Sequence, residues 1–159
     1  MSSGIRTGRL ALAVLFIFVL HAAFAGLLVI YRVHPNAALT ALLISCLFVD
    51  AATGAWLGLM IGLLEGSWLA SYSGSFMVTR TIAGWAVGAL EYRIFRDNPL
   101  VAMGVAVVGT LLVECCFFLF APQPHILRWF FRTIWQSVYN GLLGLPIYYF
   151  LRRAAFARR

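Results

Sequence analysis

The sequence is a series of apolar runs separated by short polar breaks, and this pattern restricts the possible folds more than any other feature. A helix rises about 1.5 Å per residue, so about 20 apolar residues cross the ~30 Å hydrocarbon core of a bilayer. Of the 159 residues, 63% are apolar and only 11% are charged, whereas a water-soluble domain carries about 25% charged residues. We therefore expect one all-α integral membrane domain that covers residues 1–159.

The polar breaks divide the chain into six expected transmembrane helices. Pro35 closes the first break, because proline and the residue before it do not continue a helix. The stretch from Ala37 to Ala70 would be about 51 Å long as one helix, so we expect a break near Asp50, with Asp50 as the N-cap of the next helix. The expected spans are 10–31, 37–50, 53–69, 75–92, 99–121 and 130–151.

The twelve basic residues are all arginines, and their distribution predicts the orientation. Positive residues are enriched in cytoplasmic segments. With six spans, one side holds Arg6, Arg9, Arg93, Arg96, Arg152, Arg153, Arg158 and Arg159, and the other holds Arg32, Arg128 and Arg132. We therefore expect a multi-pass membrane protein with both termini in the cytoplasm, where the arginines also favour anionic membrane lipids.

The composition argues against several function classes. No arginine cluster is interleaved with surface aromatics, so we expect no nucleic-acid binding. Cys46, Cys115 and Cys116 all lie in apolar runs without metal-ligand spacing, so we expect no disulfide, metal or cofactor. Neither an HExxH motif nor a phosphate-binding glycine loop is present, and we expect no catalytic residues. His21, within the first run, is expected to be a buried histidine with a hydrogen-bond partner.

Glycines recur at every fourth position in two of the expected helices. Residues four apart share a helix face, and a row of small residues lets another backbone approach closely. Two interpretations remain open: packing against this chain's own helices, or contact with a transmembrane helix of another protein. The glycines are Gly54, Gly58, Gly62 and Gly66 in the third helix, and Gly84 and Gly88 in the fourth.

Glu65, Arg80 and Glu114 lie inside expected spans, at a similar depth in the outer half of the membrane. An ionised group there costs at least about 2.5 to 3.5 kcal/mol unless it is paired or hydrated. We therefore expect these side chains to form an inward-facing polar cluster. One arginine for two carboxyl groups requires that one acid is protonated or that the cluster opens to water. We interpret the cluster as a buried lock that sets helix register, with a proton or substrate site as the alternative.

Several short motifs, in order and spacing, resemble the bacterial rod shape-determining protein MreD family over most of the chain after the first helix. The family commonly carries Asp just after the glycines of the third helix, where this chain has Glu65 and Gly66. The motifs are Pro35, the segment Gly58–Glu65, the Ser73-Gly74 turn, the segment Ala89–Arg96 and the segment Tyr139–Pro146.

This resemblance implies a non-enzymatic scaffold in the bacterial cytoplasmic (inner) membrane, part of the cell-elongation machinery that directs peptidoglycan synthesis and cell shape. The implied partners are a single-span MreC-like protein, a RodA-type glycosyltransferase with its penicillin-binding transpeptidase, and MreB filaments, directly or indirectly. Members of the family have six helices in an architecture similar to the substrate-binding S-components of energy-coupling-factor transporters. That similarity is the source of the alternative, a small-molecule-binding membrane subunit of a transporter.

Overall fold

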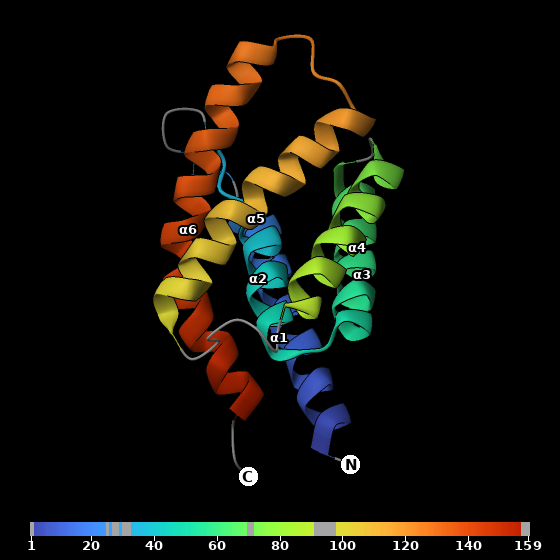
Figure 1. Cartoon of the computed structure of the whole chain (residues 1–159), viewed down its shortest axis with the longest axis vertical. Coiled ribbons are helices and arrows are strands. Elements are labelled where there is room, and N and C mark those ends of the chain that lie inside the picture. The colour runs from blue at the N-terminus through green and yellow to red at the C-terminus, as the bar shows by residue number, and fades with distance from the viewer. Residues whose placement is uncertain are drawn as a thin grey trace.

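The computed structural model describes residues 2–24, 26, 29, 33–69, 72–90 and 98–156, with side chains from Thr7 onward. These residues form six α-helices and one short 3-10 helix, with no strand, so the expected all-α class is confirmed for the described part. Successive α-helices run in alternating directions (Figure 1). The elements are α1 (Ser2–Phe24), α2 (Ala37–Ser45), η2 (Cys46–Phe48), α3 (Ala51–Leu69), α4 (Ser73–Ala89), α5 (Pro99–Phe120) and α6 (Ile126–Phe156).

The two ends of the bundle differ in what they carry. The start of α1 and the end of α6 lie together at one end, which we call the termini end, and the α5–α6 connection lies at the opposite end, which we call the loop end (Figure 1). The charged segment 91–97, together with Arg32, Arg158 and Arg159, lies outside the described residues. The predicted arginine asymmetry is therefore only partly represented in the described chain.

Local sequence signals account for the starts of three helices. The Asn36 side chain accepts a hydrogen bond from the Leu39 backbone N–H at 2.8 Å and caps α2. Asp50 caps α3, as expected, by accepting from the backbone N–H groups of Ala52 and Thr53 at 3.1 and 3.2 Å. Asn98 caps α5, and Pro99 follows it in the first helical turn. Backbone N–H groups in this turn have no partner within the helix, so the N–H that proline lacks is not missed there.

Some helix limits differ from the expected spans. The first helix begins before residue 10, and residues 25, 27, 28 and 30–32 at its expected end lie outside the described chain. The last helix is longer than 130–151, because Ile126–Phe156 continues without a break, even through Pro146. Its 31 residues correspond to about 46 Å, so the expected entry segment before residue 130 is part of the same helix.

Helix α2 is the centre of the bundle. It contacts α1, α3, α4, α5 and α6, and all of its residues from Ala38 to Ser45 are buried. A helix that is apolar on all sides gains most from burial on all sides, and Ala37–Phe48 contains no charged residue. These 12 residues correspond to only about 18 Å, so the second apolar segment is shorter than a bilayer core.

The glycine faces of α3 and α4 pack against each other. A Cβ atom added to Gly62 would lie 2.6 Å from the Phe76 carbonyl oxygen, and one on Gly66 would lie 2.6 Å from the Ser73 Cα. A Cβ on Gly58 would collide with the Arg80 carbonyl group. The close approach of two backbones therefore depends on the missing side chains.

This packing decides between the two interpretations of the glycines. Gly54 and Gly84 each lie against the other's carbonyl group, and Gly88 lies against the backbone of Asp50 and Ala51. All six glycines are thus occupied by the chain's own backbone. The expectation that one of these faces receives a separate protein's helix is not met, because no room remains on it for a second backbone.

Two helical segments in the described chain are long and apolar enough to cross a membrane by length and composition: Thr7–Phe24 and Pro99–Phe120. In each, less than a third of the apolar segment is buried within the bundle. Large apolar side chains such as Leu12, Leu112 and Leu119 consequently point outward.

Candidate functional site

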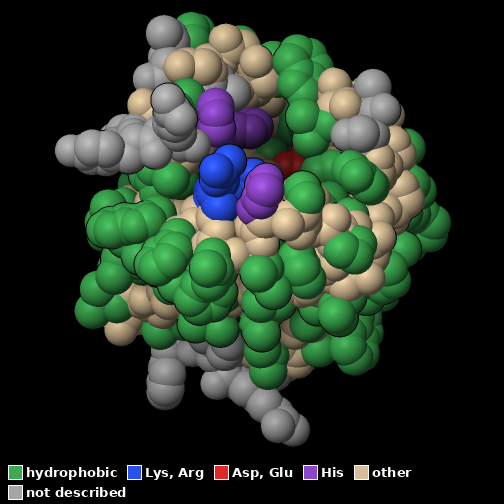
Figure 2. Space-filling view, turned by 90° about the horizontal axis from the view of Figure 1, so that it is seen from above, with side chains coloured by type: hydrophobic (Ala, Val, Ile, Leu, Met, Phe, Trp, Pro, Cys, Tyr) green, Lys and Arg blue, Asp and Glu red, His purple; other side chains and the backbone are tan. Residues whose placement is uncertain are grey.

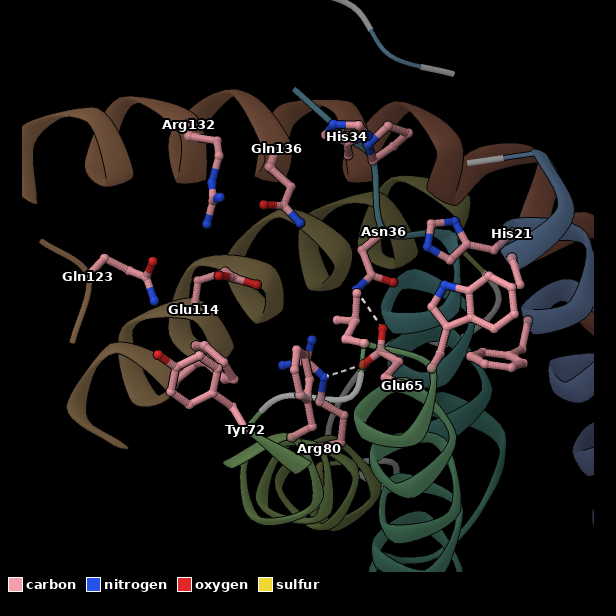
Figure 3. A pocket seen from close by; sticks show the side chains of 17 residues that line it. His21, His34, Asn36, Glu65, Tyr72, Arg80, Glu114, Gln123, Arg132 and Gln136 are labelled. Atoms are coloured by element: carbon pink, nitrogen blue, oxygen red, sulfur yellow. Dashed lines mark hydrogen bonds and ion pairs between the residues drawn. The ribbon is translucent and has the colours of Figure 1, made fainter. Parts of the chain in front are cut away.

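A cavity of about 530 Å³ lies between the helices towards the loop end, and we call it the polar cavity (Figure 3). Residues from α1, α3, α4, α5, α6 and the segments before α2 and α6 contribute to its wall. The polar and charged lining residues are His21, His34, Asn36, Glu65, Arg80, Glu114, Gln123, Arg132 and Gln136, and the aromatic lining residues are Phe18, Trp68, Tyr72, Phe76 and Phe117.

Glu65 and Arg80 form a buried ion pair at the floor of the polar cavity. The Arg80 Nε atom donates to Glu65 Oε2 at 2.7 Å, and the two side chains are 1% and 6% exposed. Arg80 also donates from Nη1 to the Thr79 hydroxyl at 3.3 Å, and its guanidinium carbon lies 4.9 Å from the centre of the Phe76 ring. The close α3–α4 packing brings these two charges together.

A chain of hydrogen bonds extends from this ion pair across the bundle. The Asn36 Nδ2 group donates to Glu65 Oε1 at 2.6 Å, and the Asn36 backbone N–H donates to Asn140 Oδ1 at 2.8 Å. Asn140 in turn donates from Nδ2 to the Thr110 hydroxyl at 3.0 Å. The polar network Arg80–Glu65–Asn36–Asn140–Thr110 therefore joins α4, α3, the cap of α2, α6 and α5.

Asn36, Asn140 and Thr110 are not among the residues expected from the sequence to form a polar cluster. Asn36 stands just before an apolar run, which is a capping signal, and Asn140 is an isolated amide within the last apolar run. A buried amide in such a run needs partners. The need for a partner indicates that Asn140 takes part in a polar contact. It does not identify the contact, because the Asn36 backbone N–H that donates to Asn140 lies 104 residues away in the chain.

Glu114 reaches the polar cavity but does not join the ion pair. Its residue is 7% exposed and lines the cavity. Within the described residues its carboxyl group has neither a hydrogen bond nor an ion pair, although it interacts electrostatically with Arg80 and Arg132. In Figure 3 the side chains of Glu114, Arg80, Arg132 and Gln136 point into one space. The three residues of the expected cluster therefore share a cavity, and two of them are paired.

Three other buried polar atoms have no hydrogen-bond partner in the described part of the chain: His21 Nδ1, Trp129 Nε1 and Thr133 Oγ1. The expectation that His21 is satisfied by a partner is thus not met for its Nδ1 atom. The His21 ring lines the polar cavity. Its Nδ1 atom is therefore a hydrogen-bonding group in the cavity wall without a partner among the described residues. Across residues 7–24, 33–69, 72–90 and 98–156, no three His, Cys, Asp or Glu side chains gather as a metal site.

Tyr72 holds an unusual backbone conformation beside the polar cavity. Its φ of 53° lies in the left-handed region, which residues other than glycine rarely adopt. The Tyr72 ring packs edge-on against Phe117 with 6.2 Å between ring centres, and Phe117 also packs on Phe76. The strained backbone of Tyr72, just before α4, thus accompanies an aromatic side chain in the cavity wall.

The fold and the site together define an all-helical bundle with a polar cavity near one end. No protein-family model, curated protein or solved structure matches the chain.

Proposed function

We propose that the chain is a multi-pass membrane protein whose six helices cross or enter the bilayer, with both termini in the cytoplasm. The outward apolar faces of Thr7–Phe24 and Pro99–Phe120 support this proposal. Soluble proteins rarely expose large contiguous apolar surfaces. The shared termini end fits an even number of crossings (Figure 1).

Reporter fusions test this topology. A reporter that works only in the cytoplasm, fused after residue 159, is expected to be active, and the same reporter inserted between Gln123 and Pro124 is expected to be inactive. Activity at the loop position, or its loss at the C-terminus, would contradict the six-span arrangement.

We propose further that the protein is a non-enzymatic scaffold of the rod-shape machinery, as the resemblance to the MreD family implies. The observation that carries this proposal is where the resembling motifs lie. The segment Gly58–Glu65 supplies both the α3–α4 contact and the ion-paired carboxylate, and Tyr139–Pro146 contains Asn140 of the polar network. The motifs thus coincide with the residues that hold the bundle together, as expected for a rigid platform.

The proposed partners are the MreC-like protein, the RodA-type glycosyltransferase with its penicillin-binding transpeptidase, and MreB. A partner helix would have to bind outside the α3–α4 glycine faces, because α3 and α4 occupy them. Membrane lipids would cover the remaining apolar surface.

Depletion and purification from detergent test the scaffold role together. Depletion is expected to convert rod-shaped cells to spheres, and the tagged chain is expected to co-purify with a single-span coiled-coil protein. Rod-shaped growth after full depletion, combined with purification of the chain alone, would refute the proposal.

One observation favours a second candidate, a small-molecule-binding subunit of a transporter. The polar cavity has a volume typical of small-molecule sites, which span about 300 to 1,000 Å³, and polar groups from several helices converge on it. Uptake defects after depletion, with cell shape unchanged, would favour this candidate over the scaffold.

A further inference from the structure

The polar cavity has charges of opposite sign at different places. The floor contains two carboxyl groups and one guanidinium group, those of Glu65, Glu114 and Arg80. Arg132 and His34 line the same cavity, and Arg132 is exposed. Seen from the loop end, basic and histidine side chains lie along one side of the opening while an acidic side chain lies deep in the hollow (Figure 2). The cavity is therefore acidic at depth and basic at its mouth.

The floor has two carboxyl groups, those of Glu65 and Glu114, and only one basic group, that of Arg80. Both oxygens of Glu65 are already used, one by Arg80 and the other by Asn36. Glu114 is 7% exposed as a residue, and its carboxyl group is unpartnered among the described residues and points into the hollow. Burial without a partner disfavours the ionised form of a carboxyl group, and a cation beside it favours that form. A ligand with a cationic hydrogen-bond donor would supply the missing partner.

The aromatic wall is suited to the same kind of group. Tyr72 and Phe117 pack together beside the cavity, and Phe76, which packs on Phe117, already has the Arg80 guanidinium group over its ring. Aromatic faces attract ammonium groups through the ring quadrupole. The left-handed conformation of Tyr72 holds this wall in place.

The mouth offers the opposite charge. Arg132 forms no ion pair within the described chain, and it also lines an adjoining pocket of about 130 Å³ with Arg128 and His125. Arginine binds carboxylate and phosphate groups through its fork of N–H donors. An acidic group on the ligand would therefore lie towards the mouth.

We propose that the polar cavity binds a zwitterion, with its ammonium group against Glu114 and the aromatic wall and its carboxylate or phosphate against Arg132. Two sources share this chemistry: a free amino acid or short peptide, and the head group of an aminophospholipid. The proposal concerns the cavity alone, so it does not depend on the scaffold role. For the second candidate function, a small-molecule-binding subunit of a transporter, zwitterion binding would specify the class of ligand.

The test compares probes that have a free ammonium group with related probes that lack one, using the purified full-length chain. The lipid probes are phosphatidylethanolamine and phosphatidylglycerol, measured by native mass spectrometry. The soluble probes are alanyl-alanine and N-acetyl-alanyl-alanine, measured by calorimetry. We expect an amine-bearing probe to bind about tenfold or more tightly than its matched amine-free probe, since a hydrogen bond to a charged group is worth at least this factor.

Variants assign the binding to the cavity. Glu114→Gln, which keeps size and polarity, is expected to abolish the preference for the amine-bearing probe. Arg132→Gln, at an exposed position, is expected to weaken binding about tenfold. Asp50→Asn and Arg153→Gln, at the termini end, remove the same charges far from the cavity and are expected to bind as the original chain does.

Each outcome of these measurements supports or overturns the proposed zwitterion binding. Preference for phosphatidylethanolamine assigns the lipid source, and preference for alanyl-alanine assigns the free one. The proposal is overturned if neither pair of probes shows an amine preference, if folded Glu114→Gln keeps that preference, or if Arg132→Gln binds without loss. The Arg132→Gln measurement remains decisive even if Glu114→Gln does not fold.

Discussion

The Asn36 side chain links a helix cap to a buried charge, because its Nδ2 group donates to Glu65 Oε1 at 2.6 Å while its Oδ1 atom caps α2. One amide thus satisfies the first turn of the central helix and completes the hydrogen bonding of an ion-paired carboxylate. The stability of the cavity floor and that of α2 are coupled through this residue.

Replacing Asn36 by alanine is expected to destabilise the protein more than removal of a cap alone. The loss combines a cap, worth about 0.5 to 2 kcal/mol, with a hydrogen bond to a charged group, worth about 1.5 to 3 kcal/mol. We expect a total of about 2 to 5 kcal/mol from denaturant unfolding in detergent. Asn98→Ala is the matched control, because Asn98 caps α5 with an exposed side chain, and about 1 kcal/mol is expected there. Equal losses in the two variants would show that the Glu65 contact contributes nothing.

Removal of either partner of the Glu65–Arg80 ion pair is expected to cost about 3 to 5 kcal/mol, because a buried charge is left uncompensated. The variants Glu65→Gln and Arg80→Met retain much of the side-chain volume. The double variant is expected to lose clearly less than the sum, since it leaves neither charge unpaired. Unfolding free energies of the four proteins form the required cycle. Strict additivity would mean that the two side chains do not stabilise each other.

Substitutions of the α3 glycines are expected to prevent folding rather than only the binding of a partner. A Cβ on Gly58 meets the Arg80 carbonyl group, which belongs to helix backbone and cannot move aside. We expect Gly58→Ala to reduce the yield of monodisperse protein several-fold, even when the chain is expressed alone.

Gly104→Ala serves as the control for this prediction, because nothing lies within 4 Å of the position that its Cβ would take. In a helix this change is expected to stabilise by about 0.5 to 1 kcal/mol. If Gly58→Ala folded as well as Gly104→Ala, the α3–α4 contact would have to be looser than the structure has it.

The Asp50 cap predicts a pH dependence at the termini end. The Thr53 hydroxyl and backbone N–H donate to the exposed Asp50 carboxylate and lower its pKa below the ordinary value. A lowered pKa in the folded state means that the ionised form contributes stability above the ordinary pKa, and that this contribution is lost as the pH falls through the folded-state pKa.

The matched variant is Asp50→Asn, which keeps a capping oxygen but removes the charge near the start of α3. The original protein is expected to be more stable than this variant at pH 7, by about 0.3 to 1 kcal/mol. In unfolding measurements this difference is expected to shrink as the pH falls below the ordinary pKa of an aspartate and through the lowered folded-state pKa of Asp50. A difference that stays constant with pH would exclude the charge as its cause.

Much of the secondary structure follows from local sequence. Pro35, Asp50 and Asn98 stop or start helices through their own backbone and side-chain preferences, so the breaks near them were predictable. The fourfold glycine spacing likewise predicts a smooth helix face. It does not say what covers that face, because periodicity describes one helix and a packing partner belongs to another.

The buried polar residues likewise were predictable in part from the sequence and depend in part on helix packing. The cost of a charge in an apolar run predicted that Glu65, Arg80 and Glu114 gather inside the bundle. Which carboxyl group pairs with the arginine depends on the distance between helices, and the glycines of α3 and α4 make that pair the close one.

The sequence by itself determined an all-helical chain with apolar helices and short breaks, since these depend on neighbouring residues. Only the tertiary structure decided that α2 is central, that Asn36 meets Asn140 across the chain, and that Glu114 is left facing a cavity. The physical reason is that side-chain partners and empty space arise from contacts between segments far apart in the chain, which no local preference specifies.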